Sequence, residues 1–373
     1  MRRFLIILGM VSLVILFAQN LFAQEEVRIG VYYPMTGPAS VYGQIGWKGL
    51  QLAHKERPTV LGKPVKLILV DNKSDKVESA NAVSRLIEKE NVTAIIGGLT
   101  SSNTLSGAPI AEKARVPMIS PWATNPLVTQ NRKYIFRACF IDPFQGLVGA
   151  KFAREVLKAK TAAVMVDIAQ DYVIGIANFF TKNFEKLGGK VIMKTFYQTG
   201  DQDFTAQLTA IAQAKPDLIY NPGYFAEDAL IARQARELGI NIPFMSGDAA
   251  QADELIKIGG EAVEGLYFTT HFEEKGVTTE SGKRFVKLFR DAYNQTPDSV
   301  SALSWDAYNM LLDAIERAGS LDKDRIRDEL ENTKDFQGAT GVITIENGDG
   351  IKPAVILKVE NGKFVYVATV QPM

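Results

Sequence analysis

Side chains that can donate hydrogen bonds follow two consecutive predicted strands. "GGLTSSNT" (97–104) comes after the apolar run 92–96, and "ISPWATNP" (119–126) carries the end of the next strand. In open α/β sheets, ligands bind beyond the carboxyl ends of the strands, where helix N-termini present unpaired N–H groups. The groups suited to a ligand carboxylate are the side chains of Ser101, Ser102 and Thr124 and the backbone around Ala123. Ser, Thr and Asn are also favoured N-caps, so either loop alone fits a purely structural role equally well.

The second half of the chain supplies the complementary chemistry. Tyr224 follows the predicted strand "DLIYNPG" (217–223), and Asp248 ends the predicted strand "PFMSGD" (243–248). An acid at a strand end, followed by small residues, suits an ammonium group, although Asp is also a common N-cap. Carboxylate donors in one half and an acid in the other predict a site for an α-amino acid zwitterion.

These residues belong to a regular alternation of strands and helices. Short apolar, β-branched runs alternate with helical patterns, which is typical of parallel sheets covered by helices. The predicted strands are 27–34, 64–71, 92–96, 117–120, 161–167, 190–197, 217–223 and 243–248. Residues 278–331 read as mostly helical, and the tail has the turn signals "NGDG" and "ENGK" between apolar strands. The pattern therefore predicts an α/β protein with two similar doubly wound domains.

The first 23 residues read as a secretory signal peptide. Arg2 and Arg3 precede a run of 15 apolar or small residues, and Ala23 offers a cleavage site. The run is shorter than the ~20 residues that a membrane span needs. No cysteine lies nearby to carry a lipid. We therefore expect an exported protein, in the periplasm or another extracytoplasmic space, without a lipid anchor.

Composition argues against several classes of function. The formal net charge is zero, which gives no reason to expect a nucleic-acid partner. Two histidines and one cysteine cannot build a His/Cys metal cluster, and a single cysteine forms no disulfide within the chain. No nucleophile elbow, P-loop or dinucleotide-binding glycine motif occurs. We expect no cofactor, no metal and no enzyme activity; the alternative is an exported enzyme acting through carboxylates such as Asp248.

Five longer stretches carry a resemblance to a known family. They are "VYYPMTGPASVYGQIGWKGLQLA", "IIGGLTSSNTLSGAPIAEKARVPMISPWATNPLVT", "FRACFIDPFQG", "DYVIGIANFF" and "NPGYFAEDALIARQARELGI". From about Val27 onward, the chain resembles the branched-chain amino acid (Leu/Ile/Val)-binding proteins of ABC importers, which are type I periplasmic binding proteins. The resemblance implies two Rossmann-like lobes with a ligand cleft between them. It implies three crossovers, near 141–143, 269–271 and 336–340. The N-terminal lobe would then comprise 27–142 and 271–337, and the C-terminal lobe 143–270 and 338–370.

The resemblance also implies roles for individual residues. Ser101 and Thr124, with the backbone of Leu99, Trp122 and Ala123, would hold the ligand carboxylate. Tyr224 and Asp248 would hold the ammonium group. The pocket wall would be formed by Tyr42, Ser102, Tyr172, Leu303 and Trp305. The family often has Glu at the position of Asp248 and a small residue at the position of Trp122, so this pocket would differ in shape.

The implied function is that of an extracytoplasmic solute-binding protein. It would act as a monomer, close on a free branched-chain amino acid (Leu, Ile or Val), and deliver it to a membrane permease. The charged ends are common to every amino acid, so the apolar wall decides specificity. One methylene is worth only about 1–3 kcal/mol, which predicts overlapping binding of Leu, Ile and Val. The alternative ligands are an aromatic amino acid, an amide or a small carboxylate.

Overall fold

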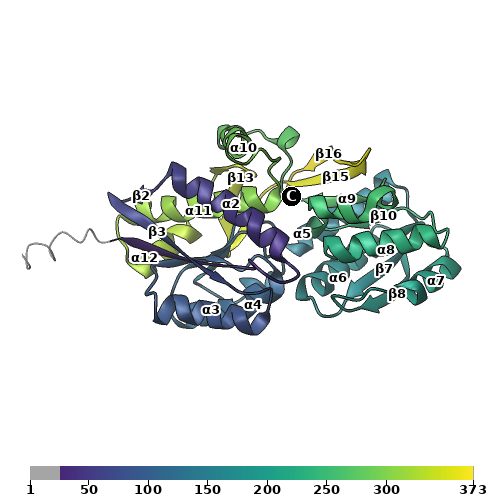
Figure 1. Ribbon diagram of the computed structural model, residues 1–373, viewed down its shortest axis with the longest axis horizontal. Helices are drawn as coiled ribbons and strands as arrows, with labels where there is room; N and C mark the ends of the chain where they lie inside the picture. Colours follow the sequence, from purple (N-terminus) through teal and green to yellow (C-terminus); the bar gives the residue numbers. More distant parts are fainter. Residues whose placement is uncertain (1–25, 373) are drawn as a thin grey trace, which may run out of the picture.

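The computed structural model describes residues 26–372, which form two α/β lobes lying side by side (Figure 1). The predicted signal peptide, residues 1–23, lies outside the described residues. Within the described part of the chain, none of the helices is both long enough and apolar enough to cross a lipid bilayer.

The N-terminal lobe is built on a six-stranded sheet with the order β2-β3-β1-β4-β5-β6. Its strands pair in parallel, except that β2 is antiparallel to β3. The strands are β1 (Val27–Tyr33), β2 (Thr59–Val60), β3 (Lys63–Asp71), β4 (Ala94–Gly97), β5 (Met118–Ser120) and β6 (Ile135–Arg137). The helices between them are α2 (Ser40–Glu56), α3 (Lys76–Glu88), α4 (Ser101–Lys113) and the short η1 (Pro126–Val128).

The C-terminal lobe has a seven-stranded sheet with the order β16-β15-β11-β10-β9-β7-β8. Its strands are β7 (Thr161–Asp167), β8 (Lys190–Tyr197), β9 (Leu218–Tyr220), β10 (Phe244–Ser246) and β11 (Tyr267–Thr270), with β15 and β16 from the tail. Its longer helices are α5 (Asp142–Lys151), α6 (Asp171–Lys186), α7 (Thr205–Ala214), α8 (Phe225–Glu237) and α9 (Asp253–Gly259). The short helical segments are η2 (Phe152–Val156), η3 (Asp248–Ala250) and η4 (Gly260–Val263).

The parallel strands of the two lobes follow the same order. In each lobe the second strand lies outside the first, and the third, fourth and fifth strands follow on the other side. This is a doubly wound arrangement, in which the carboxyl ends of the strands beside the first strand border a natural ligand site. The predicted fold, two similar doubly wound lobes, is therefore confirmed.

After β11 the chain returns to the N-terminal lobe. This segment comprises η5 (Glu274–Gly276), α10 (Glu280–Tyr293), α11 (Ser299–Ala318), α12 (Lys323–Glu331), β12 (Phe336–Gly338), β13 (Gly341–Glu346) and β14 (Asp349–Ile351). Helix α11 starts with a capping box between Asp298 and Ser301 and is buried along most of its length against α2. The final strands, β15 (Ala354–Glu360) and β16 (Lys363–Val370), then join the C-terminal sheet.

The third crossover lies later than the sequence predicted. Strands β12–β14 form a small sheet of their own, and the amide of Arg137 at the end of β6 donates to the Gly348 carbonyl (2.9 Å). The side chain of Arg137 also pairs with Asp349 at 2.8 Å. Residues 338–351 therefore lie beside the N-terminal lobe. We place the crossover at Lys352–Pro353, not at 336–340.

Candidate functional site

The start of helix α4 presents hydrogen-bond donors to the cleft. Gly98 has φ +65° and turns the chain after β4; a Cβ there would lie 2.1 Å from Thr104 Oγ1. Thr100 occupies the N-cap position, but its side chain caps no backbone N–H group. Ser101 Oγ accepts a hydrogen bond from the Asn125 amide (3.2 Å), which leaves its own hydrogen free to donate. The hydroxyl groups in this loop are therefore not explained by helix capping.

Two further donors from the next loop are buried without a partner. Trp122 Nε1 and Thr124 Oγ1 have no hydrogen-bond partner within the described structure. Both residues are almost fully buried and line the same cavity as Ser101. Leaving a buried polar group unpaired costs about 1–3 kcal/mol. An acceptor placed in this cavity, such as a carboxylate oxygen, would remove that cost.

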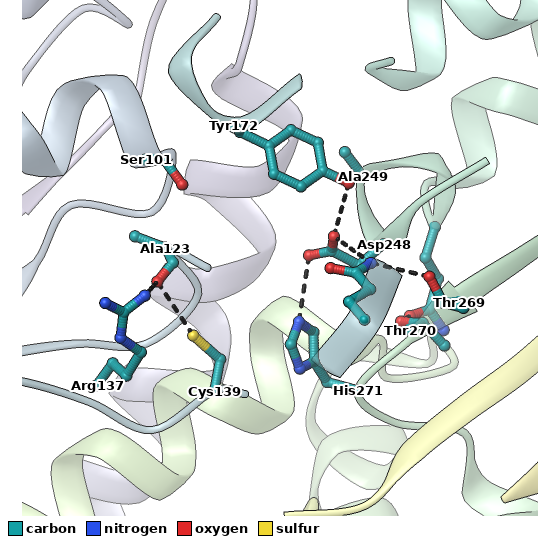
Figure 2. A network of polar contacts seen from close by, with 12 residues as sticks. Ser101, Ala123, Arg137, Cys139, Tyr172, Asp248, Ala249, Thr269, Thr270 and His271 are labelled. Carbon is teal, nitrogen blue, oxygen red and sulfur yellow. Dashed lines mark hydrogen bonds and ion pairs between the residues drawn. The ribbon is translucent and has the colours of Figure 1, made fainter. Parts of the chain in front are cut away.

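Asp248 faces the cavity from the C-terminal lobe and is held by three side chains (Figure 2). Its Oδ1 accepts hydrogen bonds from the Tyr172 hydroxyl and from Gln145 Nε2, both at 2.8 Å. Its Oδ2 lies 3.2 Å from His271 Nε2. Because these partners are side chains and the carboxylate caps no backbone N–H group, Asp248 is not serving as an N-cap.

Gly247 makes the contact between Tyr172 and Asp248 possible. A Cβ at this glycine would lie 2.1 Å from the Tyr172 hydroxyl. Any other residue would therefore push the ring away from the carboxylate. The "SGD" sequence at the end of β10 therefore supplies the carboxylate of Asp248 and, at Gly247, the room that the Tyr172 hydroxyl needs to reach it.

Asp248 is held by neutral donors. Burial lowers the pKa of His271 to about 4, so its imidazole is neutral near pH 7. Because an ionised carboxylate only accepts, the neutral ring donates from Nε2. Gln145 and Tyr172 carry no charge either. A cation placed beside Asp248 would therefore supply the positive charge that its present partners lack.

The two sets of groups enclose one small cavity. It is lined by Leu99, Thr100, Ser101, Trp122, Thr124, Tyr172, Tyr224, Asp248 and Ala249, and its volume is about 10 Å³. That volume is near the lower limit for one water molecule, roughly 10–15 Å³. An amino acid the size of leucine therefore fits only after the lobes separate and the walls rearrange.

Aromatic rings make up much of the wall. The Tyr42 and Trp122 rings lie 4.7 Å apart between centroids, and Tyr224 lies 5.9 Å from both Tyr42 and Tyr172. Ring faces of this kind suit both an apolar side chain and a cation. Tyr42 stands behind the lining residues, where it packs against Trp122 and Tyr224.

Direct hydrogen bonds hold the lobes together around the cavity. The Tyr42 hydroxyl in α2 donates to the Ala249 carbonyl in the other lobe (2.5 Å). The Asp171 amide donates to Ser102 Oγ at 2.9 Å, and Asn125 Nδ2 donates to the Asp171 carbonyl at 2.7 Å. The structure is therefore a closed form, and Ser102 contacts the opposite lobe rather than the cavity.

Five predicted site residues do not line the cavity: Tyr42 and Ser102, described above, and Leu303, Trp305 and Ala123. Leu303 and Trp305 lie in the interior on α11, and the Trp305 ring packs 5.4 Å from that of Phe285 in α10. Ala123 is also occupied elsewhere, since its amide donates to Ser120 Oγ (3.2 Å) and its carbonyl accepts from Arg137 Nη1 (2.6 Å). These residues serve packing and loop geometry in this structure.

Four residues at the site were not predicted. Thr100 and Ala249 line the cavity, and Gln145 and His271 contact Asp248. Gln145 lies in the quoted stretch "FRACFIDPFQG", and His271 ends the predicted second crossover, so their positions beside the hinge were the available signal. Among the described residues, no group of three or more His, Cys, Asp or Glu side chains is arranged to hold a metal ion.

Two doubly wound lobes, joined by three crossovers and closed over a small site, define the class of two-lobed solute-binding proteins. Within that class, the chain belongs to the periplasmic binding protein family, whose sequence model matches residues 26–363. The fold is that of the type I proteins, as the solved structures below show.

Named relatives cover nearly the whole chain. A leucine-, isoleucine-, valine-, threonine- and alanine-binding protein of Pseudomonas aeruginosa is 32% identical over 342 residues, 89% of each chain. The crystal structure of a leucine binding protein from Thermotoga maritima MSB8 is 50% identical with a TM-score of 0.91, over 93% of this chain and 99% of that chain. A branched-chain amino acid transporter substrate binding protein from Streptococcus pneumoniae, in complex with isoleucine, is 31% identical with a TM-score of 0.88, over 93% and 100%.

Proposed function

We propose that this protein is an extracytoplasmic solute-binding protein of an ABC importer. It binds a free branched-chain amino acid, Leu, Ile or Val, between its lobes and passes it to a membrane permease. The names of its relatives support this function. The observation that carries it for this chain is the pairing, across one cavity, of the unpartnered donors of Trp122 and Thr124 with the Asp248 carboxylate.

In this proposal the ligand carboxylate lies at the start of α4. Ser101 and Thr124 donate hydroxyl hydrogen bonds to it, and the Trp122 indole N–H is placed to join them. The ammonium group lies against Asp248, with the Tyr224 ring beside it. The aliphatic side chain packs against the rings of Trp122, Tyr172 and Tyr224, and no cofactor or metal takes part.

The contacts are sufficient for tight binding. Micromolar affinity corresponds to about −8 kcal/mol. Hydrogen bonds to charged groups contribute roughly 1.5–3 kcal/mol each, and burial of a leucine-sized side chain contributes a further ~1.5–3 kcal/mol. A few such contacts reach this value after the cost of association.

The alternative ligands fit these groups less well. A small carboxylate without an ammonium group would leave Asp248 buried without a counter-charge. An aromatic amino acid needs more room than Leu, so the walls formed by Trp122 and Tyr172 would have to rearrange further than for Leu. An enzyme acting through Asp248 would need a free carboxylate, whereas both of its oxygens are engaged by neighbouring side chains.

A thermal-shift panel tests the proposal. The protein is heated with each amino acid, with benzoate and with small amides, and the ligands are analysed afterwards for chemical change. Leu, Ile and Val should stabilise most, by about 2.7 kcal/mol at 100 times Kd, and should be recovered unaltered. Stabilisation by benzoate or an amide alone, or consumption of the ligand, would refute the proposal.

A further inference from the structure

The donors that hold Asp248 come from the crossovers that join the lobes. Gln145 lies in the first turn of α5, just after the first crossover, and His271 follows β11 at the second. Both side chains are fully buried. Gln145 Nε2 also donates to Thr269 Oγ1 at the end of β11 (2.9 Å), which links the two segments.

The third crossover reaches the same point through Lys352. Its Nζ donates to the carbonyl oxygen of His271 (3.0 Å) and lies 5.6 Å from the centre of the Phe140 ring. Phe140, in the first crossover, stacks on the His271 imidazole with the ring centroids 3.8 Å apart. All three crossovers therefore meet around His271, and His271 in turn contacts Asp248.

The two ring nitrogens of His271 differ in their hydrogen bonding. Nδ1 is buried and has no hydrogen-bond partner in the described structure, whereas Nε2 points at Asp248 (Figure 2). A histidine kept only for packing would gain nothing from a buried nitrogen that lacks a partner. Its one polar contact is with the carboxylate that faces the ligand cavity.

We propose that His271 and Gln145 are positioning residues, which fix the Asp248 carboxylate for the ligand ammonium group. This inference rests on the proposed function. His271 needs only a donor at the position of Nε2.

The test compares His271→Met, which removes the donor at similar volume, with His271→Gln, which keeps an N–H donor. Calorimetric titrations measure Kd for leucine and for its 2-hydroxy analogue, in which a hydroxyl replaces the ammonium group. His271→Met should raise the Kd for leucine about 10- to 100-fold, which is the range expected for the loss of a hydrogen bond to a charged group. It should weaken binding of the hydroxy acid less. The Kd for the hydroxy acid divided by the Kd for leucine should therefore fall. His271→Gln should restore leucine binding to within about threefold of the wild type.

The other histidine of the chain provides a matched control. His54 also makes one hydrogen bond through Nε2, to the Val65 carbonyl (2.9 Å), inside the N-terminal lobe. His54→Met should change neither Kd. Gln145→Met is the second variant if His271→Met does not fold, and it should lower the same ratio.

The following outcomes would overturn the inference. Equal weakening of leucine and the hydroxy acid would indicate a purely structural role, as would no rescue by His271→Gln. Wild-type protein that binds no leucine would remove the proposed function as well. Wild-type protein that binds leucine, with a ratio unchanged in His271→Met and Gln145→Met, would refute this inference alone.

Discussion

Asp248 is the carboxylate that lines the cavity. It is 2% exposed and accepts hydrogen bonds from three neutral side chains. Removing one partner of a buried ion pair generally costs more than removing one neutral hydrogen bond. The affinity for an amino acid should therefore depend more on this acid than on any single hydroxyl of the opposite lobe.

Asp248→Asn should weaken leucine binding by 100-fold or more, on the order of 3–5 kcal/mol, since the ligand ammonium would be left buried without a counter-charge. Ser101→Ala should weaken it only about 3- to 10-fold, because other donors remain at the start of α4. Calorimetric titration of both variants with leucine measures the difference. Similar losses in the two variants would contradict the role of Asp248.

Asp142, at the start of α5, should make stability depend on pH. Burial raises the pKa of Asp142 to about 8; the neighbouring Thr124 hydroxyl lowers it, and the nearby Asp248 raises it to a smaller extent. Between about pH 4 and 8 this group ionises only in the unfolded chain, whose pKa is ~3.9. The contribution of the protonated Asp142 carboxyl to the free energy of unfolding is therefore complete below pH 4. It is lost as the pH rises towards 8.

Asp142→Asn removes this titration. The free energy of unfolding of the wild type should fall relative to that of the variant between pH 4 and 8, by a few kcal/mol at about 1.4 kcal/mol per pKa unit. Urea unfolding at a series of pH values measures the difference. Asp291→Asn, at an exposed acid paired with Lys287, is the control and should show no such trend. A constant difference between the wild type and Asp142→Asn would show that Asp142 is ionised when folded.

At this scale the sequence predicted the parts of the site that depend on local pattern. Ser101, Thr124, Tyr224 and Asp248 all line the cavity because each follows a parallel strand, and such strand ends meet at one edge of a sheet. Gln145 and His271 were missed because their roles depend on how the crossovers pack. Leu303 and Trp305 were assigned to the wall by resemblance alone, and in this structure they pack inside the lobe.

At the scale of elements, long periodic segments were predicted best. The strand predicted at 161–167 matches β7, and the strand predicted at 190–197 matches β8. Strands β6 and β11, of three and four residues, were missed, whereas the equally short β5, β9 and β10 were found because each lies within a predicted apolar run. The position of β13 and β14 depends on contacts with Arg137, which no local pattern reveals.

Helix α2 contacts the other lobe through Tyr42, whose hydroxyl donates to the Ala249 carbonyl and accepts from the Phe225 amide (3.4 Å), and whose ring packs against Tyr224 and Phe225. Tyr42→Phe removes the hydrogen bond to the Ala249 carbonyl and the weaker one from the Phe225 amide, and keeps the ring against Trp122. Because those bonds form only when the lobes are closed, the variant should bind leucine about 5- to 10-fold more weakly, for a loss of roughly 1–1.5 kcal/mol. Titration calorimetry provides the measurement.

Tyr33→Phe is the matched control for this change. The Tyr33 hydroxyl contacts Ser304 Oγ at 3.0 Å within the N-terminal lobe. Its loss should lower stability without changing ligand affinity. Equal affinities of Tyr42→Phe and the wild type would show that the bond to Ala249 does not contribute to closure.

For the whole molecule, the division of the site between two lobes implies movement. A ligand can contact both Ser101 and Asp248 only when the lobes are closed, and the cavity of about 10 Å³ in this closed form is too small to admit leucine. The ligand therefore has differential affinity for the closed form, which is the condition for a population shift. The closed shape is the form that we propose a permease recognises.

Small-angle scattering should detect this movement. Saturating leucine should lower the radius of gyration of the protein, because hinge closure brings the centres of the two lobes together. The same samples should show one molecular mass, that of a monomer. An unchanged radius of gyration, with binding confirmed by calorimetry, would favour a preformed pocket over hinge closure.

The central claim is that the site recognises both charged ends of a free aliphatic amino acid. Calorimetric titration with three ligands tests it most directly: leucine, 4-methylpentanoate, which lacks the ammonium group, and 3-methylbutylamine, which lacks the carboxylate. Leucine should bind with micromolar or better affinity. Each of the other two should bind at least 100-fold more weakly, since each leaves charged or polar groups of the site buried without a partner. Binding of 4-methylpentanoate or the amine as tight as that of leucine, or no binding of leucine, would contradict the account.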